Sequence, residues 1–196
     1  MVALAAAPVA AADGDPASDY LIGQKVFYSF DAGIPADRAD GLTKLVANAN
    51  TAGFTIRVAL IRTNSDLGSV YQLYGKPQQY AEFLGQELRF VYRSRLLIVM
   101  PNGFGYAVGG RPAPAARRAL VGLAAPNNNG SQIADAAMLA VQRLARASGH
   151  ALPLPQTDSG SSQTSDRIKI GAIAVTCAAL LAAAMLVRRG RRAARQ

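Results

Sequence analysis

The sequence predicts an α/β fold, with a small mixed β-sheet of about four strands, helices on both faces of the sheet, and a C-terminal transmembrane helix. Three observations lead to this prediction. Strand-like and helix-like patterns alternate between residues 26 and 149, and the run 54–61 is apolar enough for a strand that is buried on both faces. Near the end of the chain, residues 170–187 carry no charged side chain.

A strand, a helix and a second strand are expected in the first half of the body. Residues 26–30 are β-branched and aromatic, which is typical of a strand. Pro35 suits the first turn of a helix whose apolar residues recur at helical spacing, and Gly53 is placed to end it. Residues 54–61 then form the strand that is buried on both faces.

The second half continues the alternation. Residues 66–69 predict a loop, and residues 79–92 predict a helix with its apolar side chains on one face. Residues 95–100 are the strongest strand pattern, and a turn returns the chain as an antiparallel strand over 105–110. Two closing helices are expected after this hairpin, marked by apolar residues over 116–123 and over 133–144.

The chain beyond residue 150 predicts a membrane anchor. Residues 151–167 are rich in Pro, Ser and Gly and predict a flexible linker. Residues 168–187 predict a transmembrane helix, because eighteen uncharged residues extend ~27 Å as a helix, close to the ~30 Å hydrocarbon core. The five arginines of residues 188–196 predict a cytoplasmic tail that attracts anionic lipid of the inner leaflet.

The N-terminal residues 1–17 are small and apolar, and three alanines before Asp13 are typical of a signal-peptidase site. A basic n-region is missing, so these residues are either the remnant of a signal peptide whose start lies upstream of Met1, or a disordered arm. The domain at residues 18–150 is therefore expected outside the cell membrane, in a single-pass protein with a cytoplasmic C-terminus.

Charge and composition exclude several classes of function. The net charge is +9, but the tail arginines, Arg167 and Lys169 account for seven positive charges. Fourteen basic and twelve acidic residues remain, about +2, so the body is expected to bind neither nucleic acid nor anionic lipid by itself. A single Cys and a single His exclude an intramolecular disulfide, a zinc site of several thiolates and any multi-histidine metal site.

No nucleophile and base are placed to act together. His150 lies at the end of the last expected helix, and Cys177 lies inside the expected transmembrane helix. The glycines between residues 103 and 110 match neither phosphate-binding motif, and a tight hairpin explains them. An anion could bind to three neighbouring arginines, which are otherwise a solvated surface: Arg89, Arg93 and Arg95. These residues favour a domain without catalytic function.

Asp31 and Asp66 are candidate metal ligands. Each follows an expected strand, and the carboxyl ends of parallel strands are where open α/β sheets place their ligands. Calcium prefers hard oxygen ligands, several of them from carboxylates. Asp37 and Asp40 lie in the first turn of a helix instead, where acidic residues complement the helix dipole without a metal.

Tyr71, Tyr74 and Tyr80 are candidates for a partner-binding surface. The stretch 67–80 that contains them is long for a loop and rich in residue types that are common in interfaces. These tyrosines either pack as an irregular cover over the sheet or form an exposed protein-binding surface.

Three stretches of the body resemble a known family. They read FDAGIP at residues 30–35, TAGFTIRVAL at 51–60 and RLLIVMPNGFGYAVG at 95–109. This pattern is similar to that of the TPM domain family over residues 26–147. The resemblance implies an exported α/β/α module anchored by a nearby transmembrane helix, in a family associated with phosphatase activity, calcium or partner-protein binding. Where the family often has acidic residues before its central strand, this chain has Tyr-Arg-Ser-Arg at 92–95.

We therefore expect a membrane-anchored extracytoplasmic domain that is non-catalytic, needs no cofactor and binds a protein partner near the cell surface. The alternative is a calcium- or metal-dependent phosphatase-like enzyme of the TPM type, which the family resemblance and the loop aspartates favour.

Overall fold

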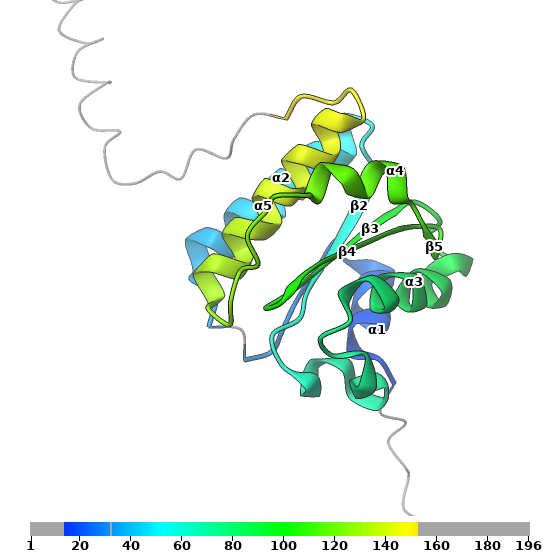
Figure 1. The fold of residues 1–196 in the computed structure, drawn as a ribbon, viewed down its shortest axis with the longest axis vertical. Helices are drawn as coiled ribbons and strands as arrows, with labels where there is room; N and C mark the ends of the chain where they lie inside the picture. Colours follow the sequence, from blue (N-terminus) through cyan, green and yellow to red (C-terminus); the bar gives the residue numbers. More distant parts are fainter. Residues whose placement is uncertain (1–13, 32, 153–196) are drawn as a thin grey trace, which may run out of the picture. The chain divides into compact units, whose positions relative to one another are not determined.

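The computed structural model describes residues 14–31 and 33–152, which form three layers with helices on both faces of one sheet (Figure 1). Most of the signal segment and linker, and all of the transmembrane helix and tail expected from the sequence, lie outside these ranges. In chain order the elements are α1 (Pro16–Gly23), β1 (Val26–Tyr28), α2 (Ala36–Thr51), β2 (Ile56–Leu60), η1 (Asn64–Leu73), α3 (Pro77–Glu87), η2 (Leu88–Phe90), β3 (Arg95–Met100), β4 (Gly103–Val108), β5 (Arg111–Pro112), α4 (Pro114–Arg117), η3 (Arg118–Leu120) and α5 (Gly130–Ala147).

The sheet has five strands in the order β1-β2-β3-β4-β5. The first three strands are parallel, and β4 and β5 are antiparallel to their neighbours. This arrangement confirms the predicted mixed sheet. The short strand β5 is an addition to the four strands that the sequence pattern indicated.

Alternate residues of the central strands face the two helical layers. Val58 and Leu97 belong to the core cluster beneath α2 and α5, whereas Ala59 and Ile98 belong to the cluster beneath α1 and α3. All four are fully buried, which confirms that these strands are buried on both faces. Figure 1 shows α2 and α5 on one side of the sheet and α1 and α3 on the other.

The two parallel connections have opposite hands. α2 joins β1 to β2 on one face, whereas η1 and α3 join β2 to β3 on the other. Both connections move to the next strand in the same direction across the sheet. Because they pass over opposite faces of the sheet, one of them must be left-handed. Such a connection is rare, since the twist of the strands strongly favours right-handed crossovers.

The start of the domain lies earlier than the sequence pattern indicated. α1 begins at Pro16, with the Asp15 side chain accepting a hydrogen bond from the Ala17 amide as the N-cap. Ala17 and Leu21 are fully buried against the α3 face of the sheet. A fragment beginning at residue 18 would therefore lack the cap and part of the core.

Two other segments differ from the prediction. The region expected as a loop at 66–69 lies within η1, a 3-10 segment with a kink at Gly68. The helix expected over 116–123 is replaced by α4 and η3, which end at Leu120. Among the described helices, none has the length and apolar character needed to span a bilayer.

Candidate functional site

The Asp66 carboxylate is buried and accepts hydrogen bonds from three protein donors. It accepts hydrogen bonds from the Ser29 hydroxyl at 2.7 Å, from the Thr63 amide at 2.8 Å and from the Arg62 amide at 2.9 Å. Thr63 and Asp66 form a capping box at the start of η1. Asp66 therefore ties η1 to the end of β1, which is a structural role.

The Arg62 side chain joins the loop after β1 to the segment before α5. It donates to the backbone carbonyl of Asp31 at 2.8 Å and to both the side-chain and the backbone oxygen of Asn128, at 3.0 and 3.1 Å. The Arg62 guanidinium therefore lies beside the backbone of Asp31, and its positive charge disfavours a metal ion there. Asp31 is exposed, and the described part of the chain contains no group of three or more metal-ligating side chains.

Replacing the two aspartates separates the structural role from the metal-binding one. We expect Asp66→Ala to lower the free energy of unfolding by about 2 kcal/mol, because it leaves the Ser29 hydroxyl and two amides without an acceptor. Asp31→Ala should change it by less than about 0.5 kcal/mol. Urea denaturation with and without calcium measures both. Stabilisation by calcium that both variants abolish would favour the phosphatase-like alternative instead.

Tyr80 belongs to the core and not to a surface. It is fully buried, and its hydroxyl donates to both carboxylate oxygens of Asp15, at 2.8 and 3.0 Å. Burial raises the pKa of Tyr80 above its ordinary value. The prediction that Tyr80 contributes to a partner surface is therefore wrong, because this side chain faces the sheet and holds α1 in place.

Tyr71 and Tyr74 do lie on the surface, together with Phe30. Tyr71 is 62% exposed and Tyr74 is 36% exposed, while the hydroxyl of Tyr74 donates to the backbone carbonyl of Arg62 at 2.7 Å. Phe30 follows β1 and is 77% exposed, with its ring edge-to-face against the buried Phe27. We call Phe30, Tyr71 and Tyr74 the aromatic surface. Tyr74 bonds to Arg62 directly, and Asp31, the neighbour of Phe30, accepts a hydrogen bond from the Arg62 side chain.

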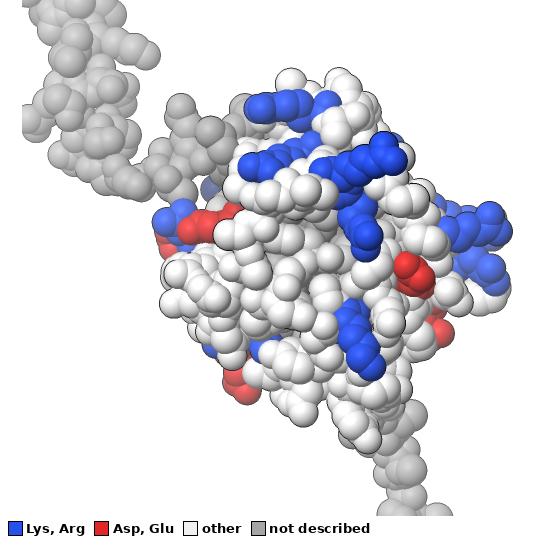
Figure 2. All heavy atoms as spheres, in the orientation of Figure 1, with Lys and Arg blue, Asp and Glu red and all other residues white. Residues whose placement is uncertain are grey.

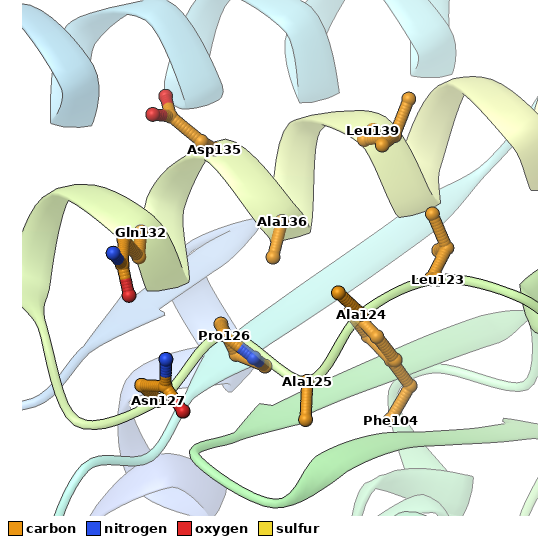
Figure 3. Close-up of a pocket in the computed structure, with 10 residues that line it drawn as sticks. All are labelled: Phe104, Leu123, Ala124, Ala125, Pro126, Asn127, Gln132, Asp135, Ala136 and Leu139. Atoms are coloured by element: carbon orange, nitrogen blue, oxygen red, sulfur yellow. The ribbon is translucent and has the colours of Figure 1, made fainter.

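A shallow apolar groove lies between α5 and the segment 123–127 (Figure 3). Its volume is about 370 Å³, and Phe104 of β4 contributes to its lining. In Figure 3 Ala136 points from α5 toward this segment, whereas Asp135 points away from it, toward α2, where it pairs with Arg38 at 3.0 Å. The lining is mostly apolar, and Asp135 is its one titratable side chain, so it offers no pair of groups for acid–base chemistry.

The remaining predicted positions have structural partners. His150 follows α5 as expected, with its amide bonded to the Ala145 carbonyl and its ring 5.7 Å from that of Phe54. Arg95 stacks over Phe54, and the Arg93 side chain donates to the Arg89 carbonyl. These contacts fix the side chains of Arg93 and Arg95, and anion binding at the three arginines stays a prediction.

Comparison with known proteins does not assign this chain to a family. No family model, curated protein or solved structure matches this chain. The resemblance to the TPM domain therefore stays a prediction.

Proposed function

We propose that this chain is a membrane-anchored extracytoplasmic domain that binds a protein partner through the aromatic surface. The observation that carries the proposal is the exposure of two large rings, Phe30 at 77% in the loop after β1 and Tyr71 at 62% in η1. Aromatic residues beside an arginine are the types that contribute most to binding energy in protein interfaces.

The hydrogen bonds around Arg62 hold Phe30 and Tyr74 of this surface in one conformation. Ser29 and Asp31, on either side of Phe30, bond to Asp66 and Arg62, and Tyr74 bonds to the backbone of Arg62. A partner therefore meets rings whose backbone is already ordered, and less conformational entropy is lost on binding.

The anchor is tested by the accessibility of residues 153–166. Protease added to intact spheroplasts should cut this linker and release the domain, while a tag after Gln196 stays protected until the membrane is opened. This result is expected because the arginines of the tail favour the cytoplasmic side. Protection of the linker in intact spheroplasts would contradict the orientation.

The aromatic surface is tested by comparing three ring deletions. We expect Phe30→Ala and Tyr71→Ala each to weaken partner binding at least about tenfold, the effect of losing a hot-spot side chain. Phe90 is 86% exposed and belongs to η2, so Phe90→Ala is a matched control that should leave binding unchanged. A photo-crosslinking residue at position 71 would capture the partner in membranes, and its affinity for each purified variant would then be measured. Equal losses in all three variants would contradict the proposed surface.

A further inference from the structure

Four exposed arginines gather where the end of α5 packs against α4 and η3. They are Arg117 of α4, Arg118 of η3, and Arg143 and Arg146 of α5. We call these four residues the arginine face. In Figure 2 several basic side chains group over the upper part of the domain, where Figure 1 places α4 and the end of α5.

The near-neutral charge of the body conceals a strong separation of charge. Residues 88–152 contain eight arginines and one acidic residue, Asp135. In the described residues before them, six basic side chains are set against eight acidic ones. Asp135 pairs with Arg38 of α2, so no acidic side chain of residues 88–152 is left to neutralise the arginine face.

An exposed aliphatic side chain lies among these arginines. Val121 follows η3 and is 75% exposed, and its carbonyl accepts a hydrogen bond from Arg143 at 3.4 Å. Guanidinium groups bind phosphate oxygens, and an apolar side chain beside them can enter the boundary between headgroups and acyl chains. This combination is typical of a surface that lies on a membrane.

The chain leaves the domain at the same end. Leu152, the last described residue, follows the turn of α5 that carries Arg146. The predicted transmembrane helix begins sixteen residues later, at Ile168, and a flexible chain of that length reaches roughly 22 Å. An anchor at this distance keeps the arginine face at a high effective concentration near the bilayer.

We propose that the arginine face docks the domain on an anionic membrane surface. This inference rests on the proposed anchor. It replaces the expectation, drawn from the near-neutral net charge, that the body does not bind anionic lipid. Electrostatic attraction to a charged bilayer acts within about 8 Å at physiological salt. Membrane binding therefore depends on the charged side chains nearest the bilayer and not on the net charge of the whole domain.

The test uses the full chain in lipid nanodiscs, with Cys177→Ser and a fluorescent label on Val121→Cys. One set of discs contains phosphatidylcholine alone, and the other contains equal parts of phosphatidylcholine and phosphatidylglycerol. We expect headgroup-attached quenchers to reduce the fluorescence at position 121 at least about twofold in anionic discs and much less in neutral ones. A label on Gln72→Cys, in η1, should be unaffected in both.

Charge variants complete the test. Changing all four residues of the arginine face to Gln should abolish the quenching, whereas a control with Gln at four other exposed basic positions, Lys25, Lys44, Lys76 and Arg89, should retain it. Equal effects of the two sets, or no difference between the discs, would overturn the proposal. Binding of a single-stranded oligonucleotide in place of anionic lipid would assign the face to nucleic acid and overturn it too. Failure of the chain to enter the discs would instead count against the anchor.

Discussion

Gly105→Ala should destabilise the domain on the order of 4 kcal/mol, because a methyl group at this position has no space. Gly105 lies in β4, opposite Ile98, where the start of α3 crosses the strand. A side-chain carbon there would overlap the backbone carbonyl of Pro77 and approach the amide of Gln78 to 2.8 Å. Both neighbours are backbone atoms, so α3 itself would have to move away from the sheet.

The movement would also break the contact that completes the edge of β4. The side-chain amide of Gln78 accepts from the backbone N–H of Tyr106 at 3.1 Å and donates to its carbonyl at 3.0 Å. The strand β5 pairs only with residues 107 and 108, so Gln78 replaces a neighbouring strand at Tyr106. Loss of both bonds would leave buried backbone groups unpaired, which adds to the steric cost.

A second glycine provides the control. Gly41 lies inside α2, and an added side-chain carbon would only touch the Met138 sulfur at 3.5 Å. Gly41→Ala should therefore stabilise the domain by up to about 1 kcal/mol, since alanine favours a helix more than glycine does. Urea unfolding followed by circular dichroism compares the two variants. If Gly105→Ala retained the stability of the unmodified protein, the close approach of α3 to β4 would be wrong.

The periodicity of apolar residues predicted the layers because burial sets that pattern directly. β2 and β3 read as apolar runs since both of their faces are covered, and α5 carries its buried residues at helical spacing. α1 was not predicted, because it buries only Ala17 and Leu21 and follows an alanine-rich segment. Its sequence signal was the pair Asp15 and Pro16, an N-cap followed by a proline in the first turn. The left-handed connection has no local pattern and depends on the whole sheet.

The candidate site, like the left-handed connection, was only partly predictable, because local sequence patterns do not fix it. Tyr71 and Tyr80 look equivalent in the sequence, but one lies on η1 and the other on the inner face of α3. The partner of Tyr80 is Asp15, which is 65 residues away in the chain. Phe30 was expected inside a strand, but β1 ends at Tyr28 and leaves this ring outside the sheet. Contacts between distant segments decide each of these positions.

The buried carboxyl of Asp15 makes the stability of the domain depend on pH. Asp15 is only 6% exposed, and burial raises its pKa from 3.8 to about 6, against the opposing effect of the hydrogen bond from Tyr80. The negative charge of Glu87 raises the pKa of Asp15 further, and the negative charge of Asp66 raises the pKa of Tyr80. The folded state therefore binds the proton of Asp15 more tightly than the unfolded chain does. This contribution to stability is complete below about pH 4 and is lost as the pH rises through about 6.

Asp15→Asn should accordingly stabilise the domain at pH 8 by up to about 3 kcal/mol, the value of a shift of about two pKa units. Asparagine still accepts from the Tyr80 hydroxyl and the Ala17 amide through its carbonyl oxygen, and it is as good an N-cap as aspartate. Loss of the negative charge at the start of α1 removes roughly 0.5 kcal/mol of this gain. At pH 4 the variant and the unmodified protein should differ little, since Asp15 is then protonated in the folded state.

Urea denaturation at pH 4, 6 and 8 tests this expectation. The quantity compared is the free energy of unfolding of Asp15→Asn minus that of the unmodified protein, because the contributions of other titrating groups cancel in this difference. The difference should grow with pH and level off above about 7. Tyr80→Phe is the complementary variant: it removes the hydroxyl that donates to both carboxylate oxygens of Asp15. It should destabilise the domain most at pH 8, where the buried carboxylate would be charged and would keep the Ala17 amide as a donor but lose Tyr80. A constant difference between Asp15→Asn and the unmodified protein at all three pH values would mean that Asp15 keeps an ordinary pKa. In that case its burial costs nothing, and α1 must open enough to let water reach the carboxylate.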